Sequence, residues 1–152
     1  MILRFIKFGW AVSLVAGLGA LLYVYASIPE HVVYSLSDKY FGKGAVTREV
    51  FFYSSLGFMA FINFLLYALS KNLKYQDESI NELIKKWQLS LAVLINIFAI
   101  VIMNFVFLVN SGETFNFDNI GYLIYVSFGF IVLWIIALPI LLVRAFKRSK
   151  QK

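Results

Sequence analysis

The side chains of this chain that are best suited to catalysis or metal binding lie between positions 27 and 49, around the only histidine, His31. Glu30, Asp38 and Glu49 share this segment, and carboxylates with an imidazole can bind a divalent metal ion. Their spacing matches none of the ligand patterns of zinc sites. The segment therefore predicts a polar loop rather than a metal centre, and we expect no cofactor.

Catalysis by His31 lacks the groups that it needs. A Ser-His-Asp arrangement would have to use a nearby serine such as Ser35 or Ser37. The absence of cysteine excludes thiolate metal sites and a cysteine nucleophile. A catalytic or metal-bound His31 would also have to meet at least two carboxylates from the set Glu30, Asp38, Glu49, Glu113 and Asp118. We therefore predict that the protein is not an enzyme and that His31 is a structural or contact residue.

The composition indicates which solvent surrounds these residues. Of the 152 residues, 61% are hydrophobic and 14% are charged, whereas an average soluble domain is about 45–50% apolar and about 25% charged. The mean hydropathy is +0.80. These values exclude a disordered chain and a water-soluble domain, because most of the apolar surface would face water. The sequence predicts a protein of the lipid bilayer.

Four apolar runs, at residues 8–26, 50–69, 89–109 and 121–143, contain no Asp, Glu, Lys, Arg or His. A helix of about 20 residues crosses the roughly 30 Å of a bilayer's hydrocarbon core. The fold class that follows is an all-α integral membrane protein with four transmembrane helices in a single domain, 1–152. Arg4 and Lys7 precede the first run as in a signal peptide, but its apolar stretch exceeds the usual 15 residues or so, and we expect a retained helix.

The basic residues predict the orientation. Eleven of the 14 Lys and Arg residues lie in the N-terminal segment, in the connection 70–88 and in the tail 144–152. The other three lie in the segment 27–49. The positive-inside rule then places both termini and the connection 70–88 in the cytoplasm and makes 27–49 an outer loop. Topology thus explains the net charge of +6, so we expect membrane lipids and no nucleic acid as partners.

Two sets of residues are candidates for contacts between helices. Small residues recur every four positions on the first helix, which lets another backbone approach closely. Carboxamides inside the apolar runs each need a partner, because a bare carboxamide in hydrocarbon is costly. They form interhelical hydrogen bonds or, alternatively, line a path through an oligomer. The two sets are Gly9, Ser13 and Gly17, and Asn63, Asn96 and Asn104.

The connection 70–88 reads as an amphipathic helical extension of the third span. Asp77 and Glu78 favour a helix N-terminus. Behind them, the apolar face Ile80, Leu83, Ile84 and Trp87 is expected to lie at the inner membrane interface or to pack on a neighbour. Near the end of the segment 27–49, Thr47 is expected to cap the second helix.

The outer loop carries a resemblance to a known family. Pro29 and His31 follow the first helix, Gly42 or Gly44 lies in a turn, and Thr47 and Arg48 open a second helix rich in aromatic residues. Over residues 15–65 this order resembles the N-terminal membrane domain of SdpI-type bacterial proteins. The resemblance implies a role in immunity to a secreted toxin or in signalling across the membrane. It also marks Pro29, His31 and Arg48 as candidates for interaction at the outer loop.

Together these observations predict a small, non-enzymatic, four-helix protein of the bacterial cytoplasmic membrane. We expect it to bind another integral membrane or envelope protein, as a subunit of a complex or as a sensor or immunity module, or to form a homo-oligomer. The alternative is an oligomeric channel or transporter component whose path is lined by asparagines.

The predicted topology can be tested by labelling introduced cysteines, since the native chain has none. Cysteines at Ser37 and Ser111 should react with a membrane-impermeant reagent added to intact cells. Cysteines at Ser79 and Ser149 should react only after the membrane is opened. The reverse pattern of labelling would contradict the orientation.

Overall fold

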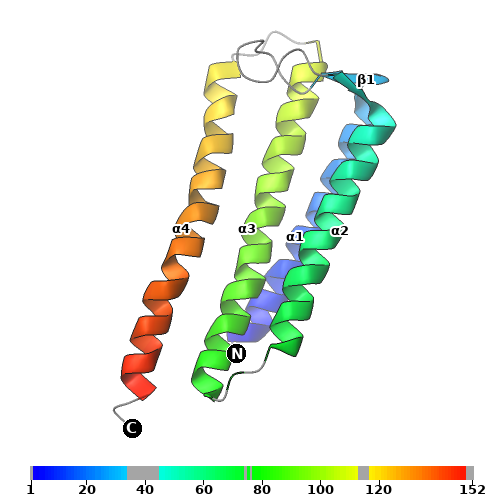
Figure 1. Ribbon diagram of the computed structural model, residues 1–152. Helices are drawn as coiled ribbons and strands as arrows, with labels where there is room; N and C mark the ends of the chain where they lie inside the picture. Colours follow the sequence, from blue (N-terminus) through cyan, green and yellow to red (C-terminus); the bar gives the residue numbers. More distant parts are fainter. Residues whose placement is uncertain (1, 34–44, 74, 76, 113–116, 150–152) are drawn as a thin grey trace.

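Four long helices make up most of the computed structural model (Figure 1). The structure describes residues 2–33, 45–73, 75, 77–112 and 117–149, with the backbone alone for 117–120 and 148–149. The helices are α1 (Ile2–Ser27), α2 (Arg48–Asn72), α3 (Glu78–Asn110) and α4 (Phe117–Ser149). Two short strands, β1 (His31–Val33) and β2 (Ala45–Thr47), lie between α1 and α2.

All four helices are long and apolar enough to cross a membrane. The stretches that meet this condition are Ile2–Ser27, Arg48–Asn72, Glu78–Asn110 and Gly121–Lys147, and each contains one of the apolar runs of the sequence. The prediction of four helices of spanning length is confirmed.

Local side-chain chemistry sets where two of the helices begin. The Thr47 hydroxyl accepts a hydrogen bond from the Val50 amide at 3.3 Å, so Thr47 caps α2 as predicted. The Asp77 carboxylate accepts hydrogen bonds from the amides of Ser79 and Ile80 at 2.8 and 3.4 Å and caps α3. In both cases a side-chain oxygen satisfies amides that the first helical turn leaves without a partner.

The segment 27–49, predicted as a loop, contains an antiparallel strand pair that joins α1 to α2. His31 lies opposite Thr47 and Val33 lies opposite Ala45. Between these pairs, Val32 is fully buried among the apolar side chains at this end of the helices. The sequence did not indicate these strands, because three residues are too few for an alternating pattern to stand out.

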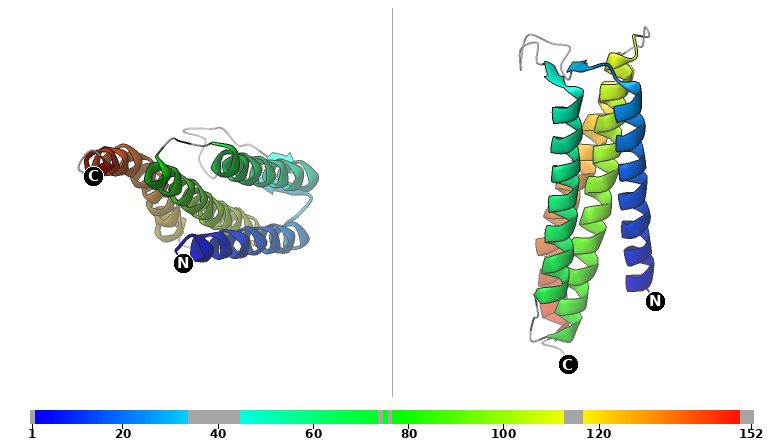
Figure 2. Two further views of the ribbon diagram at one scale, coloured as in Figure 1. Left: turned by 90° about the horizontal axis from the view of Figure 1, so that it is seen from below. Right: turned by 90° about the vertical axis from the view of Figure 1, so that its right-hand side faces the viewer.

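The other three helices, α1, α2 and α4, all pack against α3 (Figures 1 and 2). α1 and α2 lie on α3 and also touch each other, whereas the backbone of α4 approaches no helix other than α3 in the described part of the chain. One buried cluster, around Leu21, Val24 and Met103, lies toward the hairpin. A second, around Leu91 and Ile131, lies farther from it and includes the contact with α4. The result is a three-helix core with a fourth helix attached to one side.

Two tryptophans join α4 to α3. The Trp87 indole N–H donates to the backbone carbonyl of Trp134 at 2.9 Å, and the Trp134 N–H donates to the Ser90 hydroxyl at 3.1 Å. The rings therefore supply both apolar contact area and directed hydrogen bonds. Trp134 thereby fixes the position of α4 along α3.

The beginning of α3 forms a helical extension of the third span, as the sequence predicts. This segment continues without a break into the rest of α3. Ile80 and Ile84 are 4% and 7% exposed, so the chain itself covers their apolar side chains. On the exposed side, Lys86 forms an ion pair with Glu82 at 2.9 Å. Packing against a neighbouring part of the chain, the second predicted placement, agrees with this burial.

Gly17 is the most crowded of the described glycines. A Cβ atom at Gly17 would lie 2.5 Å from Cε of Met59 on α2, whereas one at Gly19 would have nothing within 4 Å. Met59 is itself 3% exposed, so its end has little room to move. A side chain at position 17 would thus have to displace the end of Met59 within the buried cluster.

Replacing Gly17 by Leu should therefore lower the free energy of unfolding by about 1–3 kcal/mol, the usual cost of overpacking. The measurement is SDS-induced unfolding in detergent micelles. Gly19→Leu is the matched control on the same helix and should have little effect. Equal losses in both variants would contradict the close approach.

Candidate functional site

A pair of asparagines lies at the centre of the three-helix core. Asn63 on α2 and Asn96 on α3 are 4% and 1% exposed. The Asn63 amide donates to Oδ1 of Asn96 at 2.7 Å, and the Asn96 amide donates to Oδ1 of Asn63 at 3.1 Å. The second N–H of Asn63 reaches the carbonyl of Met59 at 2.8 Å. The two carboxamides therefore satisfy each other across the helix interface.

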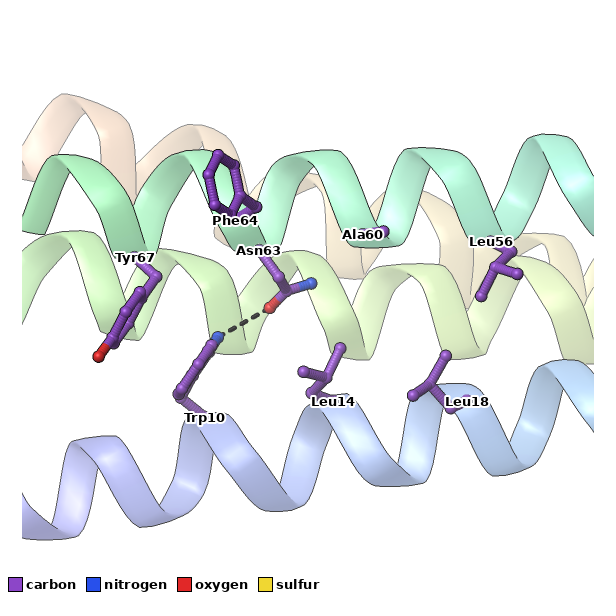
Figure 3. Close-up of a pocket in the computed structure, with 8 residues that line it drawn as sticks. All are labelled: Trp10, Leu14, Leu18, Leu56, Ala60, Asn63, Phe64 and Tyr67. Atoms are coloured by element: carbon purple, nitrogen blue, oxygen red, sulfur yellow. Dashed lines mark hydrogen bonds between the residues drawn. The ribbon is translucent and has the colours of Figure 1, made fainter.

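Helix α1 joins this pair through two more side chains. The Asn96 amide donates to the Ser13 hydroxyl at 3.0 Å, and that hydroxyl donates to the Trp10 carbonyl at 2.9 Å. The Trp10 indole N–H donates to Oδ1 of Asn63 at 2.8 Å (Figure 3). Ser13, Trp10 and the two asparagines thus form a polar cluster that connects α1, α2 and α3.

A groove of about 340 Å³ lies beside the polar cluster, between α1 and α2 (Figure 3). Its walls are almost entirely apolar and include Leu14, Leu56 and Tyr67. The Tyr67 ring stacks on the Trp10 ring, with centroids 5.2 Å apart. Because Trp10 and Asn63 are already bonded to each other, the groove offers shape and apolar contact with little free hydrogen-bonding capacity.

The chemistry open to the polar cluster is limited. Its members are neutral, and both N–H groups of each carboxamide have an acceptor. A transport path or a catalytic site would need polar groups free to bind a substrate or to exchange protons. The cluster is suited to holding three helices in register, because no N–H group of its two carboxamides is left without an acceptor.

The other sequence candidates on the helices lie elsewhere. Gly17 sits at the close approach to Met59, whereas a Cβ atom at Gly9 would have nothing within 4 Å. Gly9 lines a different groove, between α1, α3 and α4. Asn104 is exposed, and its amide donates to the Ile100 carbonyl of its own helix at 2.8 Å. Of the three asparagines, two therefore join the polar cluster and one does not.

The hairpin end of the molecule carries the remaining candidates. Pro29 and His31 are exposed, and the Arg48 amide donates to the Glu30 carbonyl at 2.8 Å. The Arg48 guanidinium lies over the Tyr25 ring, 4.9 Å from its centroid, and Nε lies 3.8 Å from a Glu49 oxygen. This cation–π contact ties the start of α2 to the end of α1.

No group of three or more His, Cys, Asp and Glu side chains among the described residues could hold a metal ion. Of the carboxylates considered for His31, Asp38 and Glu113 lie outside the described residues, and the Asp118 side chain is not described. Gly42 and Gly44, which carry part of the family resemblance, also lie outside them.

Asn110, at the end of α3, is a contact that the sequence did not single out. Its side-chain oxygen accepts from the Val33 amide at 2.9 Å, and its amide donates to the Val33 carbonyl at 2.8 Å. The carboxamide therefore pairs with β1 as a further strand residue would, and it holds the hairpin on α3. The sequence does show a polar residue at the last position of an apolar helix. Polar residues are common at the ends of such helices, so this feature alone did not mark Asn110 as a contact residue.

Comparison of the chain with models of known families, with curated proteins and with solved structures finds no match.

The asparagine pair can be tested by a double-mutant cycle. Asn63→Leu and Asn96→Leu should each lower the free energy of unfolding in detergent by about 1 kcal/mol. The double variant should lose less stability than the sum of the two single losses, because the second change removes a group that already lacks its partner. Ser54→Leu is the control, because the Ser54 side chain is exposed and bonds only within α2 in the described structure. Additive losses would show that the two carboxamides act independently.

Proposed function

We propose that this chain is a multi-pass protein of a bacterial cytoplasmic membrane that binds another membrane or envelope protein through its hairpin end. It works without catalysis, as a subunit of a complex or as a sensor or immunity module. The helices form the scaffold, and the hairpin is the surface that the partner contacts.

The observation that carries this proposal is the way the hairpin is held. Val32 is buried against the helices, and the Asn110 side chain bonds both backbone groups of Val33. The opposite face of the strand pair is exposed along its length, at His31, Val33, Ala45 and Thr47. A surface fixed in this way loses little conformational entropy when a partner binds, which favours affinity.

The polar cluster supports binding over transport. An asparagine-lined path would need carboxamides that face an opening, whereas Asn63 and Asn96 bond to each other and to α1. The resemblance to SdpI-type proteins adds the class of process, immunity or signalling, and the bacterial membrane. Of the residues that carry the resemblance, Pro29, His31 and Arg48 lie at the hairpin end.

Photo-crosslinking from the hairpin tests the proposal. A photoreactive amino acid at position 31 should give a crosslinked product with a second, different protein in the membranes of the native host. The matched control is position 82, where Glu82 is exposed near the start of α3, at the other end of the helices (Figure 1). Crosslinked products of equal intensity from both positions would argue against the proposal. The absence of any crosslinked product from position 31 would argue against it as well.

A further inference from the structure

Asn104 is a carboxamide within the apolar run 89–109, and it is exposed. Its amide reaches the Ile100 carbonyl one turn earlier, and no bond joins its carboxamide to another helix in the described ranges. In hydrocarbon, the oxygen and the second N–H of this carboxamide lack the water that would satisfy them at a protein surface in solution. The free energy of the chain would fall if a neighbouring molecule supplied both partners.

Asn104 lies on a face of α3 that begins at the contact with α4 and is open farther along. Ser90, Ile97 and Asn104 follow one another at intervals of seven residues, which places them on one face of a helix. Ser90 is half-buried and accepts a hydrogen bond from Trp134 of α4, whereas Ile97 and Asn104 are exposed. Around Ser90, the same face holds an apolar groove of about 620 Å³ between α1 and α4, whose rims carry Phe5 and Phe130. The exposed part of this face, together with the groove, is called the α3 stripe.

We propose that a second copy of this chain covers the α3 stripe and that Asn104 of one copy bonds to Asn104 of the other. Two copies with the same topology are related by an axis along the membrane normal, so their α3 helices run parallel. The same residue then lies at the same depth in both. A carboxamide has both a donor and an acceptor, so two of them satisfy each other across such an axis.

The spacing of the stripe fits this geometry. A repeat of seven residues keeps two parallel helices in contact along a left-handed crossing. A single asparagine within such a repeat sets the register and the number of helices, because any shift leaves its carboxamide unpaired. At the other end of the stripe, Phe5 and Phe130 are 69% and 58% exposed, and they supply apolar surface for the facing copy.

The inference rests on the proposed membrane location but not on a partner at the hairpin. The dimer and the hairpin partner use different surfaces, so either can fail without the other. Photo-crosslinking from position 31 tests the hairpin, and the two experiments below test the stripe.

Disulfide crosslinking locates the contact, because the native chain has no cysteine. Asn104→Cys in lipid vesicles should give a covalent dimer on mild oxidation. Ser54→Cys is the control, since Ser54 is exposed on α2 and lies six residues from the start of that helix, as Asn104 lies six residues from the end of α3. Equal crosslinking at both positions, or none at position 104, would overturn the proposal.

Dimerisation measured by energy transfer between labelled copies in vesicles gives the strength of the contact. Asn104→Leu should weaken the dimer about 3- to 30-fold, the equivalent of one or more interhelical hydrogen bonds in a membrane. Asn104→Gln, which keeps the carboxamide, should weaken it less, and Ser54→Leu should leave it unchanged. A wild-type chain that stays monomeric at every protein-to-lipid ratio, or an Asn104→Leu dimer as tight as the wild type, would exclude the proposed contact.

Discussion

The hydrogen-bonded pair of Asn63 and Asn96 is the constraint on which the arrangement of the helices depends. In a bilayer, apolar side chains gain little by meeting each other rather than lipid, so directed bonds and close packing decide which helix faces align. The pair fixes α2 against α3, and the bonds from Ser13 and Trp10 bring α1 to the same level. A slip of any of these helices by one turn would leave carboxamides unpaired between the helices.

A second fixed point lies at the hairpin end. Asn110 holds β1 on α3, and the Arg48 guanidinium over the Tyr25 ring holds the start of α2 against the end of α1. Two fixed levels along the same three helices determine both their spacing and their axial positions. The position of the exposed hairpin face therefore follows from contacts formed deep among the helices as well as from its own strand pairing.

The features that follow from local rules were predictable from the sequence. Run length and composition indicated four helices, and side-chain oxygens before an apolar run marked the caps Thr47 and Asp77. The need of Asn63 for a partner was also evident, but its bond to Trp10 was not, because 53 residues separate the two and the pairing depends on helix packing. The same holds for Asn110, whose partner is a backbone 77 residues away.

Among the described residues, the backbone of α4 lies close to that of α3 only, which points to an order of assembly during synthesis. A ribosome releases the chain from its N-terminus, and domains and segments that emerge first can fold first. By the time α4 emerges, α1, α2 and α3 already hold every member of the polar cluster, and the contacts of α4 with α3, among them the Trp87–Trp134 hydrogen bond, remain to be made. A late or missing α4 would thus leave a three-helix core whose polar cluster is already complete.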